Sequence, residues 1–406
     1  MISKISTSGF VEQIRPSDSS SGACSDSIST SGACSDSIDS SCWLYLIPYD
    51  TFEVIFDKLS LKDVFNCTKV SKKLKNRVDE YLNETLRDIR ISLGGKVRPQ
   101  NVYKITLKYP KIKIFYNASP YIRDYYLKFL KNVYCLNLTR CNSIKNLNLS
   151  QKVNCNVKKN NIFLFNTAIS DISCLNNINT LILSHTMISD VSSLSNVENI
   201  DLSNTLVEDI SNLHNARYLD LGNTMVRDLN FLPPKIKVLN LGNTLVKNIK
   251  NVPKSLERIF LNHTGIKDVT SLKNLKEIDL SYTCVENVSC LKDVDILNLD
   301  SCLSIKKYGK LNNRKLILKD NIIHDINDII SDKVKILDIS NTEVEDVNSL
   351  TGLEELNISW CLNITEVNSL HNLKKLNISW CMNIRNIYNL TNLETLIAKE
   401  VPNLEM

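Results

Sequence analysis

The stretch "IDLSNTLVEDISNL", Ile200–Leu213, contains the pattern that decides the fold. Ile200 and Leu202 alternate with polar residues, which is typical of a short strand with both apolar side chains turned inward. Val207 then turns the chain back, and the "DIxxL" segment supplies a second inward layer. One such coil buries about five apolar side chains, which is too few for stability alone, so it must stack on similar neighbours.

The phrase apolar-x-Leu/Ile-x-x-Thr recurs twelve times, with spacings of 19 to 21 residues. Each unit ends at one of the following residues: Thr167, Thr186, Thr205, Thr224, Thr244, Thr264, Thr283, Cys302, Asn321, Thr342, Cys361 and Cys381. A period this regular predicts a solenoid. Coils this short leave no room for a full helix, so turns or short 3₁₀ segments are expected opposite the strands.

Length and composition limit the class of protein. The chain has 406 residues, 43% of them hydrophobic and 23% charged, and its net charge of +5 is spread without a basic block. This favours a folded protein without preference for nucleic acid or membrane. No apolar stretch reaches the ~18 residues of a membrane span, and no signal peptide is expected. Thirteen cysteines without a CxxC pair indicate free thiols and a cytoplasmic, or nuclear, location.

Changes in composition predict four segments. Residues 1–42 are Ser-rich and repeat "SGACSDSI" at Ser21–Ile28 and Ser31–Ile38, so they are expected to be disordered. Residues 43–83 are predicted to form three short helices, residues 84–134 a connector and N-terminal cap, and residues 135–406 the solenoid. Heavy use of Asn, Lys and Ile is typical of AT-rich genomes, such as those of large DNA viruses or some protists.

The predicted helical segment carries one clear apolar stripe. Phe52, Ile55, Phe56 and Leu59 fall at i, i+3, i+4 and i+7, and Pro48 suits the first turn of a helix. About forty residues give only a marginal core. Because such short helices expose more apolar surface than one small bundle hides, a partner surface is expected here.

The repeating unit is similar to the leucine-rich repeat family, over about residues 135–406. In that family the Asn, Thr or Cys after "LxLxx" points inward and hydrogen-bonds the backbone of the turn. The resemblance implies an α/β-type leucine-rich repeat solenoid, with a parallel β-sheet on the concave face and turns or short 3₁₀ segments on the convex face. Units with Cys have one extra residue before the next apolar position, as in Cys361–Ile364, and resemble the cysteine-containing repeats found downstream of F-boxes.

Residues 47–79 resemble the F-box. The opening Leu-Pro of the motif is Ile47-Pro48, its first helix is Val54–Leu59, its acidic step is Leu61–Val64 and its "VSKxW" block is Val70–Leu74, where Leu74 replaces the tryptophan. The resemblance implies a small α-helical domain that docks on a Skp-type linker, in a substrate receptor of a cullin–RING ubiquitin ligase. The residues carried over to linker binding are Ile47, Pro48, Phe52, Ile55, Phe56, Leu59, Leu61, Val64 and Val70. Alternatively, the same residues form the core of the bundle.

No catalytic residue, metal site or cofactor is predicted. His185 and His263 share a repeat position but lie four coils apart, roughly 19 Å at ~4.8 Å per strand, too far for one metal ion. The sequence has no phosphate-binding loop and no nucleophile elbow. Leu232–Thr244 resembles the repeats of bacterial ubiquitin ligases that add a catalytic cysteine domain, but the repeats continue to Met406, so an enzyme is not expected.

The concave face is the predicted surface for a target protein. Acidic residues take outward positions in the strands, and aromatic or His residues precede several of the inward Thr and Cys residues. The predicted target contacts are His185, Asp201, Asp220, His263, Asp279, Tyr282, Asp338, Trp360 and Trp380. Two alternatives remain: a scaffold or decoy without ubiquitin function, and an Asp/Asn ladder that only solvates the face.

The "LNISWC" units place tryptophan and cysteine side by side. Trp360 and Trp380 are expected to face outward and to form a platform of two rings. Cys361 is expected to be a buried, unreactive thiol. Cys381 follows one coil later at roughly 5 Å between α-carbons, within disulfide reach, but a reducing compartment should keep the two thiols apart.

Overall fold

The computed structural model describes residues 76–80, 90–108, 113–130, 132–145, 147, 160–173, 175, 178–227, 229 and 231–405. The chain divides into two compact units, one of residues 1–90 and 107–112 and one of residues 91–106 and 113–406. In the first unit, residues 76–80 are helical and Val78 is fully buried. The predicted Ser-rich tail and all nine predicted linker contacts, from Ile47 to Val70, lie outside the described residues.

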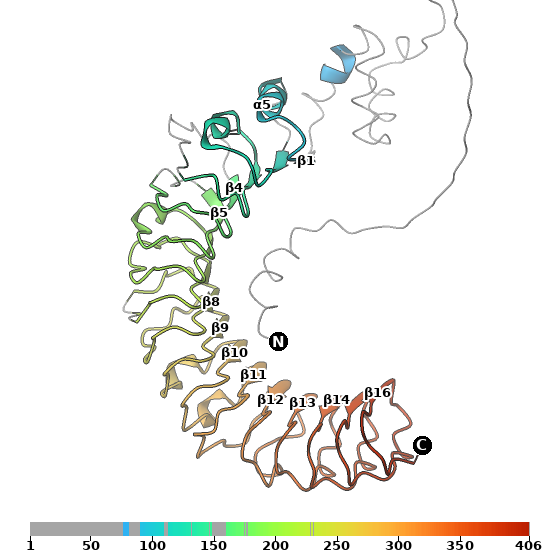
Figure 1. The fold of residues 1–406 in the computed structure, drawn as a ribbon. Coiled ribbons are helices and arrows are strands. Elements are labelled where there is room, and N and C mark those ends of the chain that lie inside the picture. Colours follow the sequence, from blue (N-terminus) through green and yellow to red (C-terminus); the bar gives the residue numbers. More distant parts are fainter. Residues whose placement is uncertain are drawn as a thin grey trace, which may run out of the picture. The chain divides into compact units, whose positions relative to one another are not determined.

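The described part of the chain forms one sheet of sixteen strands, which follow each other in sequence order (Figure 1). Neighbouring strands are parallel from β2 onward, and from β5 to β16 they pair residue for residue, as in Asp201↔Asp220. The strands are β1 Arg90–Gly94, β2 Lys113–Asn117, β3 Cys135–Asn137, β4 Asn160–Phe163, β5 Ile178–Ile182, β6 Asn199–Asp201, β7 Tyr218–Asp220, β8 Val238–Asn240, β9 Arg258–Phe260, β10 Glu277–Asp279, β11 Ile296–Asn298, β12 Lys315–Ile317, β13 Ile336–Asp338, β14 Glu355–Asn357, β15 Lys375–Asn377 and β16 Thr395–Ile397. This is the predicted parallel solenoid, with one short strand in each coil.

The coil that contains β7 shows how the repeat builds the core. Leu219 and Leu221 point inward from the strand and the residue after it, and Val226 and Leu229 close the coil from the other sides. All four side chains are buried. Because the strands pair in register, each layer continues into the next coil, and the solenoid has one continuous apolar core.

Short 3₁₀ segments occupy the return layer, as the coil length predicted: η4 Ser192–Leu194, η5 Thr270–Leu272 and η6 Ser289–Leu291. The Asp of the "DIxxL" segment fixes this turn. Asp190 accepts a hydrogen bond from the backbone N–H of Ser192 at 2.8 Å, and Asp268 accepts one from Thr270 at 2.9 Å. These backbone hydrogen bonds lower the pKa of both carboxyls. The acidic residues here therefore have a structural role.

Residues 84–134 contribute two strands to the same sheet, which the sequence did not reveal. The segment contains β1, helix α5 (Pro99–Lys108), β2 and the 3₁₀ helix η3 (Asp124–Phe129). Strand β2 pairs in parallel with β3, and the buried Tyr116 donates its hydroxyl hydrogen to the Val97 carbonyl at 2.9 Å. None of the helices in the described residues has the length and apolar character needed to cross a bilayer.

The inward Thr residues satisfy the backbone of their own coil. The hydroxyl of Thr205 donates to the Leu202 carbonyl at 2.6 Å, and Thr224 and Thr244 repeat this bond with Leu221 and Leu241. In the coils of Thr224 and Thr244, the same carbonyl also accepts the backbone N–H of the Thr at 3.2 Å, so the residue closes the turn with both of its donors. The predicted role of Thr in the turn is confirmed.

The thiols of the inward Cys residues donate hydrogen bonds to backbone carbonyls of the preceding coil instead. The thiol of Cys361 donates to the Ile339 carbonyl at 3.0 Å, and that of Cys381 donates to Ile358 at 2.9 Å. Both thiols are fully buried and unbridged. Burial raises the pKa of Cys361 and raises that of Cys381 to about 12. Cysteine is thus a turn residue, and its thiol is protonated and unreactive at neutral pH.

Candidate protein-binding surface

A row of residues with left-handed backbone runs along the carboxyl ends of the strands. In each described coil, the residue before the inward Thr, Cys or Asn has a φ between 52° and 67°. We call these residues the left-handed row: Arg140, Asn166, His185, Asn204, Asn223, Asn243, His263, Tyr282, Ser301, Asp320, Asn341, Trp360 and Trp380. Their backbone N–H groups donate to the next coil, as from Trp360 to the Ser379 carbonyl at 2.9 Å. The row is therefore held rigidly at the spacing of the coils.

The aromatic members of the row are costly for the fold. Asn is the non-glycine residue best suited to this backbone conformation, and it occupies five positions of the row. Tyr282, Trp360 and Trp380 have bulky side chains in the same conformation, with φ of 57°, 67° and 65°. Such strain costs ~1–3 kcal/mol per residue and is concentrated at functional sites. The backbone thus marks these rings as candidates for binding.

The aromatic rings of the row pair across neighbouring coils. Trp360 and Trp380 stack with ring centroids 4.7 Å apart and planes 12° apart. His263 and Tyr282 stack in the same way, at 4.3 Å and 11°. The side chain of Trp360 is 50% exposed and that of Tyr282 47%. The predicted platform of two tryptophans is present, and the His263–Tyr282 pair is a second platform that was not predicted.

The placement of these rings on the sheet was wrong. Trp360 follows the end of β14 by three residues and Tyr282 follows the end of β10 by three, so both lie in turns. The strands are this short because the chain must turn to bring the next inward residue into the core. The rings consequently border the concave face. Target binding by His185, His263, Tyr282, Trp360 and Trp380 stays a prediction.

The acidic residues of β6 and β7 are not available to a partner, which corrects the prediction for Asp201 and Asp220. Their exposed fractions are 1% and 5%. Each carboxylate folds back on its own chain: Asp201 accepts the N–H of Ser203 at 2.9 Å, and Asp220 accepts that of Gly222 at 2.9 Å. Asn240 in the next coil covers Asp220 and donates to it at 2.9 Å.

Asp279 and Asp338 are half-buried, and their carboxylates accept hydrogen bonds in the same way. The donors are the backbone N–H groups of Ser281 and Ser340, both at 2.9 Å. The side-chain oxygen of Asn240 likewise accepts the backbone N–H of Gly242 at 3.0 Å. The Asp/Asn ladder is therefore a backbone brace at the end of the strands. Whether Asp279 and Asp338 also contact a target stays a prediction.

We expect Asp220→Asn to stabilise the solenoid at neutral pH. Burial, and then the neighbouring charge of Asp201, raise the pKa of Asp220 above its value in the unfolded chain. The folded chain then binds the proton more tightly, so the contribution of Asp220 to stability is full below about pH 4 and is lost as pH rises through the folded pKa. The side-chain amide of the variant carries no charge, so it loses no stability as pH rises. Its oxygen can still accept the hydrogen bond from the N–H of Gly222. The expected gain at pH 7 is on the order of 1–3 kcal/mol.

Denaturant unfolding at several pH values between 4 and 8 measures this effect. The stability difference between the variant and the natural chain should grow as pH rises. Asp220→Ala is the control, because it removes the acceptor for Gly222 and should destabilise at every pH. A difference that does not change with pH would contradict the expectation.

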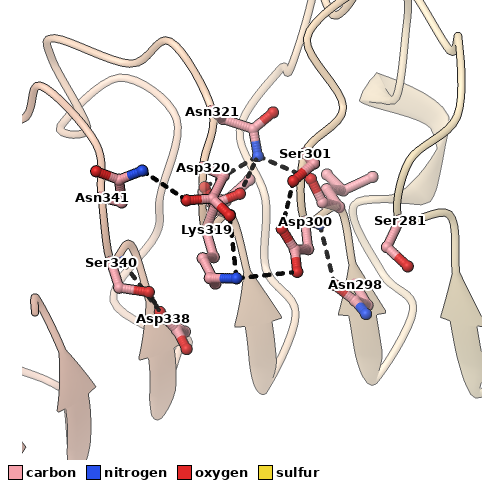
Figure 2. A network of polar contacts seen from close by, with 12 residues as sticks. Ser281, Asn298, Asp300, Ser301, Lys319, Asp320, Asn321, Asp338, Ser340 and Asn341 are labelled. Carbon is pink, nitrogen blue, oxygen red and sulfur yellow. Dashed lines mark hydrogen bonds and ion pairs between the residues drawn. The ribbon is translucent and has the colours of Figure 1, made fainter. Parts of the chain in front are cut away.

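The coils between the two aromatic platforms carry a charged network, which Figure 2 shows. Lys319 lies 3.6 Å from the Asp300 carboxylate and 3.0 Å from that of Asp320, and Asn341 donates to Asp320 at 2.7 Å. The hydrogen bond to Asp320 raises the pKa of Lys319. The left-handed row thus offers a partner two apolar platforms with a polar segment between them.

One exposed row escaped the sequence analysis. The residue directly after the inward Thr, Cys or Asn is apolar and exposed in many coils, beginning with Met187 and Leu206. The signal lay in the repeat alignment, because the same repeat position is apolar in many units. It was missed because an apolar residue beside Val207 is easily assigned to the core.

The described residues contain no cluster of three or more His, Cys, Asp or Glu side chains that could hold a metal ion. His185 forms an edge contact with Phe165 at 5.0 Å, and His263 stacks on Tyr282. Both histidines thus belong to aromatic contacts of the left-handed row. The side chains of this surface can therefore stack and form hydrogen bonds.

Residues 44–83 match the family model of the F-box domain. The match covers the segment in which the sequence resembles this motif, including every predicted linker contact. The stacked repeats follow it in the same chain. Residues 44–83 are therefore an F-box domain, and a solenoid of short repeats follows it. Both resemblances drawn from the sequence are confirmed, and the solenoid is the larger part of this protein.

Three solved structures resemble the fold of this chain. An internalin from Listeria monocytogenes has 20% identity and a TM-score of 0.48, covering 78% of this chain and 88% of that one. The functional domain of InlJ from Listeria monocytogenes, described as including a cysteine ladder, has 14% identity and a TM-score of 0.40, covering 66% and 67%. The leucine-rich effector protein YopM from Yersinia pestis has 14% identity and a TM-score of 0.42, covering 59% and 83%. No curated protein matches the sequence.

Proposed function

We propose that this protein is a substrate-recognition adaptor without catalytic activity of its own. The F-box docks on a Skp-type linker of a cullin–RING ubiquitin ligase, and the solenoid holds a target protein. Other subunits of the ligase transfer ubiquitin. The adaptor acts in the cytoplasm or the nucleus.

One observation carries the proposal: an F-box at 44–83 is joined to a solenoid that presents exposed, stacked rings on a rigid row. Aromatic residues fixed in place are preferred anchors in protein interfaces, because they bury large areas at low entropic cost. The strained backbone at Tyr282, Trp360 and Trp380 supports a binding role, since Asn would fit the fold better. Target specificity then comes from the left-handed row.

A pull-down with a purified Skp-type linker tests the adaptor role. The intact chain should retain the linker, and Pro48→Ala/Ile55→Asp should lose roughly 100-fold in affinity, because a charge buried in an apolar interface costs several kcal/mol. Pro48→Ala alone, with an unchanged circular dichroism spectrum, separates lost contact from a lost fold. Trp360→Asn/Trp380→Asn is the matched control and should bind the linker as the intact chain does. If the intact chain retains no linker, the adaptor proposal fails.

The second candidate is a scaffold or a decoy that binds partners without serving a ligase. It is favoured if the chain binds the linker but the ubiquitination of bound targets does not depend on the chain. Reconstitution with cullin, RING subunit, ubiquitin-activating and ubiquitin-conjugating enzymes distinguishes the two. In the adaptor case, target modification requires both the F-box and the left-handed row.

A further inference from the structure

A second row of side chains runs beside the left-handed row and is apolar. Met187, Leu206, Met225 and Leu245 lie in four consecutive coils, each directly after an inward Thr, with exposed fractions of 66%, 46%, 46% and 44%. We call these four residues the apolar row. Single exposed apolar side chains are common, but a contiguous line of four marks an interaction surface.

The fold does not require apolar residues at this position. Gly265 and Glu343 occupy it in other coils and are exposed there. The neighbouring residues Thr205 and Val207 are buried, so Leu206 is not needed to complete the core. The exposed line therefore calls for a functional explanation rather than a packing one.

The backbone holds the apolar row rigidly. The N–H of Leu206 donates to the Ile188 carbonyl at 2.9 Å, and that of Met225 donates to Val207 at 3.1 Å. Leu245 repeats the bond with Val226 at 3.1 Å. Three of the four residues are thus tied to the preceding coil, and their backbone is held at the coil spacing before a partner binds.

A line of cations flanks the second half of the apolar row and continues into the next coil. Arg227, Lys247 and Lys267 follow its repeat position by two residues in three consecutive coils, and all are exposed. None of them forms an ion pair with another residue in the described part of the chain, although many other lysines and arginines of the solenoid do. Exposed Glu208 precedes them, and Glu286, which pairs with Lys306 at 2.7 Å, follows. Arg227 and Lys247 therefore leave unmatched positive charge, whereas Lys267 lies close enough to Glu286 to help lower the pKa of that carboxyl.

Lysine also extends the apolar surface. A Cβ atom added to Gly265 would lie 3.3 Å from Cγ of Lys247, so the methylene stem of Lys247 covers the position that lacks a side chain. Beyond it, Cys284, Leu303 and Ile322 are again exposed. The surface is a ridge of apolar groups with positive heads along one side.

The spacing of the row selects the secondary structure of a partner. Parallel strands are ~4.8 Å apart, so the four residues span about 14 Å. An α-helix presents one side chain per turn every ~5.4 Å, about 16 Å over the same three steps. A β-strand presents side chains on one face every ~6.8 Å, about 20 Å over three steps. The side-chain spacing of a helix therefore matches the spacing of the apolar row. The side chains of a strand fall out of step with the row after one coil.

We propose that the apolar row and its cations dock an acidic amphipathic α-helix of a partner protein. The apolar face of the helix lies on Met187, Leu206, Met225 and Leu245, and its carboxylates pair with Arg227, Lys247 and Lys267. The mode is that of an amphipathic helix laid on a hydrophobic surface. This binding goes beyond the proposed adaptor function, because it requires neither the F-box nor the aromatic platforms.

The test uses the full chain and a labelled synthetic helix of about 20 residues, with Leu at i, i+4, i+7 and i+11 and Glu along one flank. Fluorescence anisotropy should show micromolar binding that weakens at high salt. Met225→Glu/Leu245→Glu should lower the affinity at least tenfold. Glutamate is compatible with the fold here, as Glu343 shows. Leu362→Glu, an exposed residue at the same repeat position in a distant coil, should bind as the natural chain does.

A charge exchange makes the test specific. The variant Arg227→Glu/Lys247→Glu should no longer bind the acidic helix. It should instead bind a helix of the same sequence with Lys in place of Glu. The proposal is overturned if the acidic helix does not bind, if a peptide of alternating Leu and Glu binds as well, or if binding survives Met225→Glu/Leu245→Glu. It is also overturned if the natural chain is a dimer that Met225→Glu dissociates, because the row then binds a second copy. Linker binding, measured in parallel, should not change in any variant.

Discussion

Asn321→Ala is expected to unfold the central coils at much lower denaturant concentration than the natural chain. The amide nitrogen of Asn321 lies within hydrogen-bond distance of three carbonyl oxygens, those of Leu299 at 2.7 Å, Leu318 at 2.9 Å and Lys319 at 3.1 Å (Figure 2). The side chain is buried, so these carbonyls have no access to water. The carbonyls of Leu299 and Lys319 also accept backbone N–H groups, from Cys302 at 3.3 Å and Ser301 at 2.9 Å. Alanine therefore leaves the Leu318 carbonyl without a side-chain donor and weakens the other two, at a cost of ~2–3 kcal/mol.

Asn321→Thr is the matched comparison. Its hydroxyl should donate to Leu318 in the same coil, as Thr224 does to Leu221 at 2.6 Å. It cannot also reach Leu299 in the preceding coil, so a smaller loss of ~1–2 kcal/mol is expected. Guanidinium unfolding ranks the three chains, and hydrogen exchange in β11 and β12 shows whether the loss is local, as expected for a stack of repeats. Equal losses for alanine and threonine would refute the role assigned to the side-chain nitrogen.

Trp360→Asn/Trp380→Asn is expected to abolish target binding while leaving the fold at least as stable. Asparagine relieves the strain of two left-handed tryptophans, ~1–3 kcal/mol each, and the variant loses one stacked pair worth ~0.5–1.5 kcal/mol. The expected change in unfolding free energy is therefore near zero or favourable. Removal of two central aromatic anchors should lower the affinity for the target at least 100-fold.

The measurement combines thermal unfolding with recovery of the target protein by the tagged chain. Asn223→Gly/Asn243→Gly is the control, because it changes two members of the left-handed row that carry no ring and keeps their backbone conformation accessible. This control should recover the target normally. A destabilised tryptophan variant would show that the platform serves the fold, and unchanged recovery would show that the target binds elsewhere.

The periodic core was predictable because each coil repeats one simple physical requirement. Ile200, Leu202, Val207, Ile210 and Leu213 must all face inward, and the same spacing returns in every unit. Local pattern and global fold therefore agree. The 3₁₀ turns followed from the length of the coil, and the parallel sheet from the resemblance to leucine-rich repeats.

The surface was less predictable, as three positions show. Asp201 was expected in solvent, but its carboxylate is buried because it accepts the N–H of Ser203 and neighbouring coils cover it. Met187 was not recognised as exposed, although its repeat position is apolar in many coils. Strand β2 was not recognised because its pattern lies outside the repeat. Burial and pairing at these places depend on neighbouring coils, and a single unit does not encode them.

The sequence by itself determined the F-box, the number of residues in a coil, the inward layers and the role of Thr and Cys in the turns, because these depend on contacts repeated within one unit or between identical units. Only the tertiary structure decided which polar side chains fold back on the backbone, that His263 stacks on Tyr282, and that Trp360 and Trp380 occupy a left-handed backbone. It also placed the apolar row beside cations that form no ion pair with any residue the structure describes. Exposure and charge balance are properties of the stacked assembly, since each coil forms the surroundings of the next.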